Sequence, residues 1–242
     1  MKERLDLLMV SLSLVRSRSE AADLIRRGKV EVNGKPADKP ARECSRTDDI
    51  RILEKQYVGR GAHKLAHALK EFGVQVHGKV AMDIGASTGG FTEVLLQEGA
   101  RHVYAIDSGS GQLASKLFSD SRVTSLERTD IRMLNPKRIT ERAEIIVIDV
   151  SFISLTHVIP TLRQFMDRKA EVIALIKPQF EVGQDLIGKN GIVHDAAARE
   201  GAIRKIREAA AKCGLREKGM IESPLAGGSG NVEYLIHLTP EA

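Results

Sequence analysis

The segment Val80–Phe91, V-A-M-D-I-G-A-S-T-G-G-F, constrains the fold of this chain more than any other. A short, mostly apolar run leads into a turn rich in glycine, and the helix-forming residues Thr92–Gln97 follow at once. This order predicts a strand, a tight turn and a helix, with the backbone of the turn facing a ligand. The glycines of the turn permit positive φ angles and close approach of a ligand to the backbone.

Strand and helix patterns alternate after this unit, as a doubly wound α/β sheet requires. The expected strands are Val80–Ile84, His102–Ile106, Val123–Leu126, Glu144–Asp149, Glu171–Ile176, Met220–Glu222 and Glu233–Leu238. The expected helices are Val58–Phe72, Thr92–Gln97, Gly111–Phe118, Leu155–Met166 and Ala196–Cys213. We therefore expect residues 56–242 to form a Rossmann-like domain around a mostly parallel seven-stranded sheet.

The residues before this domain predict a separate, smaller α+β domain over positions 1–55. Apolar residues from Leu5 to Leu12 recur at helical spacing. Ser17 and Glu20 form a capping box that opens a second short helix. Asn33-Gly34 is a strong signal for a two-residue hairpin turn, and Asp49–Leu53 is the next plausible strand.

This small domain carries much of the chain's basic excess. Its 13 Lys and Arg against 10 Asp and Glu contribute +3 of the net charge of +5. The series Ser17-Arg-Ser-Glu-Ala and Ile25-Arg-Arg-Gly-Lys-Val-Glu-Val-Asn-Gly-Lys35 resembles the small RNA-binding domain shared by a small-subunit ribosomal protein, pseudouridine synthases and tyrosyl-tRNA synthetases. Cations gathered on one helix and its exit suit phosphate contact and recognition of structured RNA. The candidate RNA contacts there are Arg4, Arg16, Arg18, Arg26, Arg27, Lys29 and Lys35.

The glycine turn does not match the two best-known nucleotide fingerprints. Ser87 stands where the dinucleotide motif needs glycine, and no phosphate-loop Gly-Lys-Ser/Thr follows. Asp107, after the second strand, suits the two ribose hydroxyls, and Asp130, after the third, suits an adenine edge. Asp83 would repel a pyrophosphate but attract the amino group of a methionine moiety. These acids favour S-adenosylmethionine. The candidate cofactor residues are Asp83, Gly85, Ala86, Ser87, Gly89, Gly90, Phe91, Asp107, Asp130 and Asp149.

Five longer motifs run through the chain. They are Gly61-Ala-His-Lys-Leu65, Asp83-Ile-Gly-Ala-Ser-Thr-Gly-Gly-Phe-Thr-Glu93, Ile148-Asp-Val-Ser-Phe-Ile-Ser154, Ile176-Lys-Pro-Gln-Phe-Glu-Val-Gly183 and Ser229-Gly-Asn-Val-Glu-Tyr234. Together they resemble the TlyA family, which joins the RNA-binding domain above to an FtsJ-like ribose 2′-O-methyltransferase domain. The chain departs from the family pattern at Gly59, where serine is common, and at Ser108-Gly-Ser110, where an aromatic residue is usual. The second departure removes an aromatic side chain that could line an adenosine pocket.

The resemblance implies a catalytic tetrad of Lys64, Asp149, Lys177 and Glu233. A ribose 2′-hydroxyl must lose its proton as it attacks the methyl carbon, and a lysine near other cations can accept that proton. We expect Lys177 to be this base, and the other three residues to orient it and the hydroxyl.

The expected substrate is ribosomal RNA, by family implication at a cytidine. The short extent of the chain beyond its two domains favours the family members that act on the large ribosomal subunit alone. Arg60 and Lys189 are further candidate RNA contacts, and Glu181–His194 is a candidate lid. The two cysteines, Cys44 and Cys213, lack metal or disulfide spacing, so a cytoplasmic protein is expected.

Three alternatives accompany this interpretation. His63 and His67 have the spacing of a metal pair but no evident third ligand, so we expect no metal site. A membrane-active haemolysin, a label that TlyA-type proteins have carried, would need an apolar or amphipathic membrane segment, and none is evident. A non-catalytic RNA-binding or ribosome-assembly factor would not need an intact tetrad.

Overall fold

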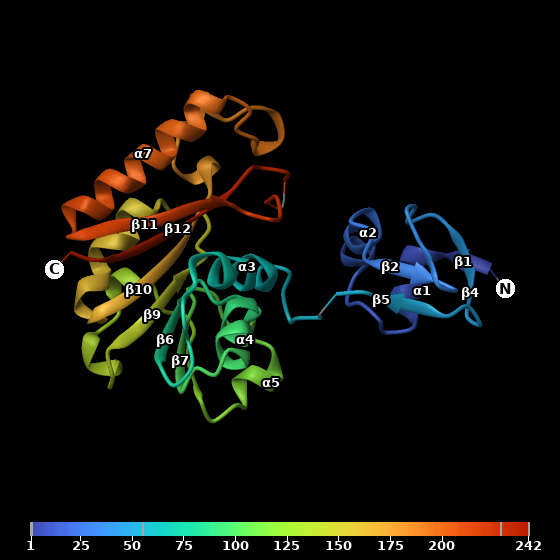
Figure 1. Cartoon of the computed structure of the whole chain (residues 1–242), viewed down its shortest axis with the longest axis horizontal. Coiled ribbons are helices and arrows are strands. Elements are labelled where there is room, and N and C mark those ends of the chain that lie inside the picture. The colour runs from blue at the N-terminus through green and yellow to red at the C-terminus, as the bar shows by residue number, and fades with distance from the viewer. Residues whose placement is uncertain (1, 55, 228, 242) are drawn as a thin grey trace. The chain divides into compact units, whose positions relative to one another are not determined.

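The computed structural model describes residues 2–54, 56–227 and 229–241. The chain divides into two compact units, with the division between Gln56 and Tyr57 (Figure 1). Each unit has its own hydrophobic core. The smaller unit precedes the division, and the larger unit contains the glycine turn.

The smaller unit is an α+β domain in which two helices pack on short strands. Its elements are β1 (Lys2–Arg4), α1 (Leu5–Ser11), α2 (Arg18–Arg26), β2 (Val30–Val32), β3 (Lys35–Pro36), β4 (Glu43–Ser45) and β5 (Ile50–Ile52). Strands β3, β2 and β5 form one antiparallel sheet, and β1 pairs with β4. The pairing of β1 with β4 was not expected, because strands of three residues show too little alternation to reveal themselves.

Local sequence signals set the boundaries in this unit. Ser17 caps α2, since its hydroxyl accepts a hydrogen bond from the Glu20 amide at 3.2 Å. The capping box is incomplete, because the Glu20 carboxylate accepts from the Arg16 amide instead of from Ser17. Asn33 and Gly34 both have positive φ, 54° and 71°, as a type I′ hairpin turn requires.

The larger unit is built on a seven-stranded sheet in the order β11-β12-β10-β9-β6-β7-β8. Its strands are β6 (Val80–Ile84), β7 (His102–Ile106), β8 (Val123–Leu126), β9 (Ala143–Ile148), β10 (Met166–Ile176), β11 (Leu215–Glu222) and β12 (Tyr234–Pro240). Adjacent strands from β10 to β8 are parallel, and β12 is antiparallel to both of its neighbours. The mostly parallel sheet expected from the sequence is confirmed.

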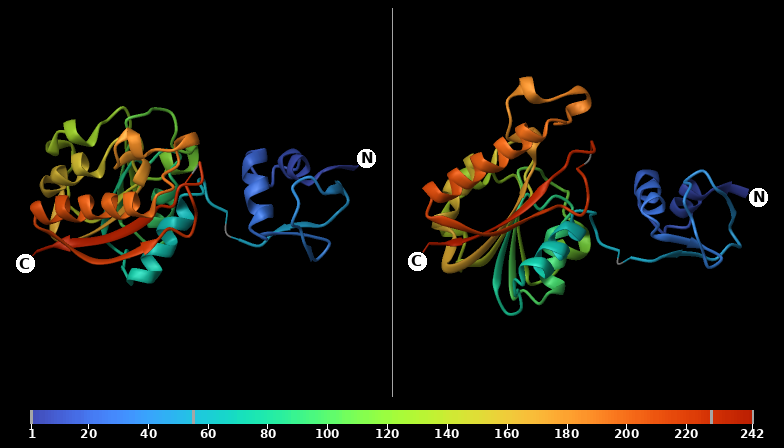
Figure 2. Two further views of the ribbon diagram at one scale, coloured as in Figure 1. Left: turned by 90° about the horizontal axis from the view of Figure 1, so that it is seen from above. Right: turned by 45° about the horizontal axis from the view of Figure 1, so that its top comes forward.

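Helices cover both faces of this sheet (Figures 1 and 2). The α-helices are α3 (Ala62–Phe72), α4 (Gly90–Gln97), α5 (Ser115–Phe118), α6 (Leu155–Val158) and α7 (Ala196–Lys212). Short 3-10 turns are η1 (Ile131–Met133), η2 (Pro136–Arg138), η3 (Ile159–Gln164), η4 (Pro178–Phe180), η5 (Gln184–Leu186) and η6 (Lys189–Gly191). Along β6 the side chains alternate: Met82 packs in the core beneath α6 and α7, and Ala81 packs in the core beneath α3 and α4.

Three expected helices are shorter than their sequence patterns suggested. Helix α3 begins at Ala62 instead of Val58, because two glycines, Gly59 and Gly61, weaken helix formation just before it. The segment expected to run as one helix from Leu155 to Met166 breaks into α6 and η3, where Pro160 lacks an amide donor. Helix α5 is a single turn at Ser115–Phe118.

Candidate active site

The glycine turn between β6 and α4 has the unusual backbone that its sequence implied. Gly85, Ser87 and Gly89 have φ values of 89°, 48° and 94°. A Cβ atom at Gly85 would collide with the main-chain oxygen of Asp149, which follows the adjacent strand β9. A Cβ atom at Gly89 would collide with Leu117, so this glycine serves helix packing. Gly85 and Ser87 line both of the cavities described below, and Gly89 lines neither of these two.

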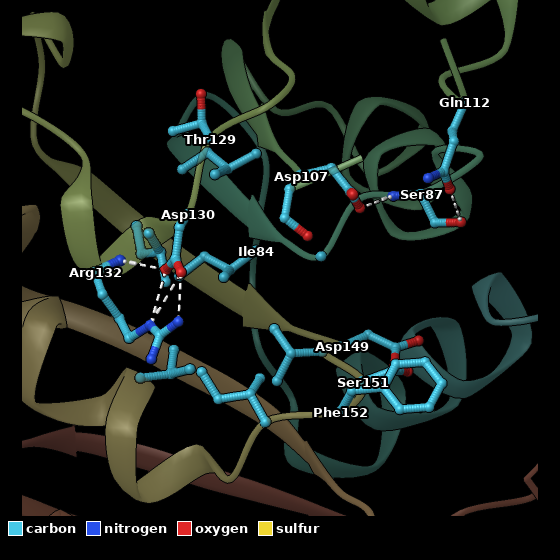
Figure 3. Close-up of a pocket in the computed structure, with 17 residues that line it drawn as sticks. Ile84, Ser87, Asp107, Gln112, Thr129, Asp130, Arg132, Asp149, Ser151 and Phe152 are labelled. Carbon is cyan, nitrogen blue, oxygen red and sulfur yellow. Dashed lines mark hydrogen bonds and ion pairs between the residues drawn. The ribbon is translucent and has the colours of Figure 1, made fainter. Parts of the chain in front are cut away.

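A cavity of about 470 Å³ opens at the carboxyl ends of β6, β7, β8 and β9 (Figure 3). Its walls include Asp107, whose two carboxylate oxygens accept hydrogen bonds from the amides of Ser87 and Gly109, each at 2.7 Å. These bonds connect the acid after β7 to the glycine turn after β6. The carboxylate is thus fixed at the cavity wall, in the position where the sequence placed a ribose-binding acid.

The acid expected at an adenine edge, Asp130, also lines this cavity, but it has a partner that the sequence did not reveal. The guanidinium of Arg132 binds its carboxylate, with Nη2 2.5 Å from Oδ2, as Figure 3 shows. The Arg132 amide also donates to Oδ1 at 2.9 Å. The side-chain hydrogen bond from Arg132 lowers the pKa of Asp130.

Asp83 lies deeper than the other acids and lines neither of the cavities described here. It is fully buried, and its Oδ2 accepts a hydrogen bond from the Thr92 hydroxyl at 2.6 Å. Its other oxygen, Oδ1, has no hydrogen-bond partner among the described residues. The pKa of Asp83 is raised to about 7, chiefly by burial and to a smaller extent by the nearby acids Asp149 and Asp107, while the hydrogen bond from Thr92 opposes the rise.

A second cavity, of about 280 Å³, shares Gly85, Ser87 and Asp149 with the first. Its remaining walls come from the segment before α3, the start of α4 and the ends of β10 and β12. All four residues of the expected tetrad line it, together with other candidates from the sequence. The lining residues are Gly59, Arg60, Gly61, Lys64, Gly85, Ala86, Ser87, Thr88, Gly90, Phe91, Asp149, Lys177 and Glu233.

The strand register explains how Lys177 and Glu233 come to the same cavity. Ile176, the last residue of β10, pairs with Tyr234, the first residue of the antiparallel β12. Lys177 follows one strand and Glu233 precedes the other, so both lie at the same edge of the sheet. Asp149 joins them because Ile148, at the end of the parallel β9, pairs with Ala174 of β10.

The four residues form two lysine–carboxylate pairs. Lys64 Nζ lies 2.5 Å from Glu233 Oε2, with 6% and 2% of the two side chains exposed. Lys177 Nζ lies 2.6 Å from Asp149 Oδ1, an ion pair whose alignment is too poor for a hydrogen bond to that oxygen. Lys177 also donates a hydrogen bond to Ser151 Oγ at 2.9 Å. The Lys64–Glu233 pair is almost completely buried, whereas the Lys177–Asp149 pair is more accessible to solvent.

Several residues near these cavities escaped the sequence interpretation. Phe152 lines the larger cavity with its side chain 92% exposed and a positive φ of 63°. Glu181 is buried behind the loop that carries Ser151, and burial raises its pKa. Asn231 fixes the candidate lid 181–194, because its side chain binds the main chain of Gly191 and Val193. The one signal in the sequence that could have pointed to Phe152 is the stretch Ser151-Phe-Ile-Ser154, which places an aromatic residue shortly after the fourth expected strand.

The candidate RNA contacts of the smaller unit differ in how freely they face solvent. Arg26, Lys29 and Lys35 are exposed. Arg4 and Arg18 are both bound to the buried carboxylate of Asp6, and Arg16 pairs with Glu20. Arg27 was expected to contact RNA, but Glu54 binds its guanidinium at 2.6 and 2.9 Å and Asp23 binds it at 2.9 Å. Of this set, Arg27 is the one most fully engaged within the unit.

In the larger unit, Arg60 is exposed at the wall of the smaller cavity, and Lys189 is exposed in η6. Within the described part of the chain, no group of three or more His, Cys, Asp or Glu side chains could hold a metal ion. No helix formed by the described residues is long and apolar enough to cross a membrane.

Comparison with known proteins identifies the family. A model described as FtsJ-like methyltransferase matches residues 57–239, and a model described as S4 domain matches residues 3–50. The 16S/23S rRNA (cytidine-2′-O)-methyltransferase TlyA of Mycobacterium tuberculosis is 47% identical over 240 residues, which are 98% of this chain and 90% of that protein. The chain belongs to the TlyA family of FtsJ-like methyltransferases.

Two further relatives agree with this assignment. The 23S rRNA (cytidine-2′-O)-methyltransferase TlyA of Campylobacter jejuni is 35% identical, over 94% of this chain and 96% of that protein. A solved structure from Streptococcus thermophilus that carries the name hemolysin is 40% identical, covers 99% of this chain and 89% of its own, and superimposes with a TM-score of 0.78.

As an FtsJ-like methyltransferase of the TlyA family, the chain uses S-adenosylmethionine. The residues present fit that cofactor. The buried oxygen Oδ1 of Asp83 has no hydrogen-bond partner among the described residues, as a carboxylate reserved for a cationic group would. Asp107 and Asp130 line the adjoining cavity, where their carboxylates can accept hydrogen bonds from the ribose hydroxyls and the adenine amino group of a nucleoside.

Proposed function

We propose that this TlyA-family methyltransferase transfers a methyl group from S-adenosylmethionine to the ribose 2′-hydroxyl of a cytidine in ribosomal RNA. The observation that carries the proposal is the pair of lysine–carboxylate contacts around one cavity, Lys177 with Asp149 and Lys64 with Glu233, beside the glycine turn. The two relatives named above as methyltransferases carry this activity in their names.

The larger cavity would hold the nucleoside part of the cofactor. When bound, S-adenosylmethionine supplies an electrophilic methyl group on a positively charged sulfonium. The Asp107 carboxylate, already fixed by two main-chain amides, can accept hydrogen bonds from ribose hydroxyls. Asp130 would accept from the adenine amino group with the capacity left by Arg132. Asp83 would face the ammonium group, which compensates its buried negative charge.

Lys177 is the residue that takes the proton from the 2′-hydroxyl in this proposal. It is the more accessible of the two lysines, and its Nζ is held at two points, by Asp149 and by Ser151. These two contacts leave one tetrahedral position of Nζ to face the substrate hydroxyl. The base must be neutral when the hydroxyl attacks, so Lys177 gives its own proton to solvent before each turnover. Asp149 then stabilises the ammonium that forms.

Lys64 and Glu233 have a different role, because both side chains are buried and each neutralises the charge of the other. We assign them to the wall of the site, where the pair fixes the start of β12 against helix α3. Arg60, exposed at the mouth of the same cavity, would bind a phosphate next to the target ribose. The proximity of hydroxyl and methyl group in this setting supplies much of the rate enhancement.

The S4 domain would supply affinity for folded RNA through its exposed cations, which include Arg26, Lys29 and Lys35. The two methyltransferase relatives share the 23S RNA in their printed names, and one of them adds the 16S RNA. We therefore propose RNA of the large ribosomal subunit as the substrate, and the cytoplasm, where ribosomes are, as the location.

The test is methyl transfer from labelled S-adenosylmethionine to isolated ribosomal subunits, followed by mapping of the modified nucleotide. Lys177→Ala should lower the transfer rate at least 100-fold while RNA binding is retained. Lys169→Ala is the matched control, since Lys169 is an exposed lysine toward the other end of the same strand, β10. Full activity of Lys177→Ala would refute the mechanism, and methylation at a base atom would refute the reaction.

A further inference from the structure

The buried carboxylate of Glu181 has no part in the chemistry described above. Glu181 follows η4, directly after Phe180, and only 5% of the residue is exposed. Its Oε2 accepts a hydrogen bond from Ser154 Oγ at 2.5 Å, and its Oε1 accepts from the Leu155 amide at 2.8 Å. Ser154 and Leu155 are the cap and first residue of α6. The carboxylate therefore anchors the end of the loop that follows β9.

This anchor belongs to a set of contacts between two loops that leave adjacent parallel strands. The loop 149–154 follows β9, and the segment 177–181 follows β10. Lys177 contacts Asp149 and Ser151 at the inner end, next to the cavity. Farther along, the rings of Phe152 and Phe180 lie 5.2 Å apart. The contact farthest along the two loops from the cavity joins Glu181 to Ser154 and Leu155, and the Glu181 side chain is buried there.

The backbone of the loop 149–154 requires such an anchor. Phe152 has a φ of 63°, a left-handed conformation that is unfavourable for a residue with a Cβ atom. A residue in this conformation is strained and persists only where its surroundings fix the chain on both sides. Asp149 is held on one side through its main-chain bond to Ile84, and Glu181 holds the other side.

Helix α7 supports the same carboxylate from behind. Lys205 Nζ donates a hydrogen bond to the main-chain oxygen of Glu181 at 2.8 Å and lies 3.9 Å from its Oε2. The lysine thus fixes the backbone of Glu181 and partly balances its charge. The two loops and the helix meet at this one residue.

We propose that Glu181 is a positioning residue for methyl transfer: it sets the loop 149–154 so that Asp149 and Ser151 hold Lys177 in its reactive place. The proposal rests on the function proposed for Lys177. Glu181 lines neither the 470 Å³ cavity nor the 280 Å³ cavity, and it acts through the loop alone. It should therefore affect the rate of the chemical step and leave the binding of cofactor and RNA almost unchanged.

The experiment measures the single-turnover rate of methyl transfer on ribosomal subunits at saturating cofactor and RNA. Glu181→Ala should lower this rate about 10- to 100-fold, the cost of a misplacement of about 1 Å. The Kd values for S-adenosylmethionine and for RNA should change less than about threefold. Glu181→Gln should restore most of the rate, because its amide can accept from Leu155 and donate to Ser154.

The matched control is Glu144→Ala. Glu144 also accepts a hydrogen bond from a main-chain amide, that of Val80, but it lies at the opposite end of the sheet. This variant should lose stability without losing single-turnover rate. If Glu181→Ala does not fold, Ser154→Ala in the Glu181→Gln background removes the contact with Ser154 and keeps the one with Leu155, and a smaller loss of rate is expected.

A double-mutant cycle supplies a readout that general destabilisation would not move. In a Ser151→Ala background, Glu181→Ala should have a much smaller effect on the rate, because both substitutions disturb the placement of Lys177. The proposal would be overturned if the double variant lost rate by the product of the two single-variant losses. A rate for Glu181→Ala within twofold of the native value would also overturn it. An inactive Lys177→Ala with a fully active Glu181→Ala would refute this inference alone, whereas an active Lys177→Ala would refute the proposed function.

Discussion

The Nζ atom of Lys64 lies 2.5 Å from Oε2 of Glu233, although 169 positions separate the two residues in the sequence. Lys64 belongs to α3 and Glu233 immediately precedes β12, so the contact joins the start of the larger unit to its last strand. Both side chains are almost completely buried. Two charges removed from water in this way depend on each other, because either one alone would lack compensation.

The stability of the larger unit should therefore depend on the pair as a unit. Glu233→Leu should lower the free energy of unfolding by about 3–5 kcal/mol, because it leaves the Lys64 ammonium buried without a partner. Lys64→Met combined with Glu233→Leu should recover most of that loss. Thermal unfolding of the three proteins measures this, and a double variant as unstable as the single one would contradict the interpretation.

The part of the site that could best be predicted from the sequence is the set of acids at the carboxyl ends of the parallel strands. Asp107, Asp130 and Asp149 each follow an apolar run closely, and parallel strands bring such positions to one edge of a sheet. The structure gathers these three acids around one cavity. Their positions along the chain were sufficient to predict this, because each acid is placed by the strand that precedes it.

The rest of the site depends on pairings between distant segments. Glu233 reaches the cavity through the register of β12 against β10, which no local pattern reveals, and it was identified by family resemblance. Glu181 began the candidate lid in the sequence, but its contacts with Ser154 and Leu155, 27 and 26 positions away, could not be predicted before the fold was known. Asp83 was expected at a ligand from its place before the glycine turn, and the structure buries it on β6 with one carboxylate oxygen lacking a hydrogen-bond partner among the described residues.

Cofactor binding should be linked to a proton on Asp83. Its pKa is about 7 in the unliganded protein, and the ammonium of the cofactor would favour the ionised carboxylate. Binding should then release a proton below pH 7, so the Kd for S-adenosylmethionine should rise about tenfold from pH 8 to pH 6. Calorimetry in buffers of different ionisation enthalpy counts the released protons.

Asp83→Asn is the control for this linkage, because its side chain does not titrate in that range. Its Kd should be weaker than the native value at pH 8 and independent of pH between 6 and 8. A native Kd that stays constant over the same range, without proton release, would show that Asp83 does not meet the ammonium.

In the smaller unit, Asp6 should stabilise the fold through Arg4 and Arg18. Hydrogen bonds from these two arginines lower the pKa of Asp6 to about 2. The lowered pKa means that the stabilisation is complete above the ordinary pKa near 4 and is lost as the pH falls through about 2. At neutral pH, Asp6→Asn should cost about 1–2 kcal/mol, since both arginines are partly exposed.

Amide hydrogen exchange of α1 and α2 in the full chain measures this effect. Asp23→Asn is the matched control, because its partner Arg27 keeps the stronger contact with Glu54. Faster exchange in the control than in Asp6→Asn would contradict the ranking of the two acids.

Phe152 should contribute to the handling of the RNA substrate without contributing to folding. Its side chain is 92% exposed at the wall of the larger cavity, close to Ser151 and hence to Lys177. An exposed aromatic ring beside a site for a ribose is suited to stacking on an unpaired base, which is worth about 1–3 kcal/mol. Phe152→Ala should therefore lower kcat/KM for RNA about 5- to 150-fold.

Its stability should hardly change, because the exposed ring buries little apolar surface. Phe152→Gly should unfold at a slightly higher temperature than Phe152→Ala, since glycine accepts the φ of 63° without strain. Phe118→Ala is the matched control: that ring is also exposed but lies in α5 and lines neither cavity. Equal losses of kcat/KM in the Phe152 and Phe118 variants would show that exposed apolar surface, and not a base-stacking position, is responsible.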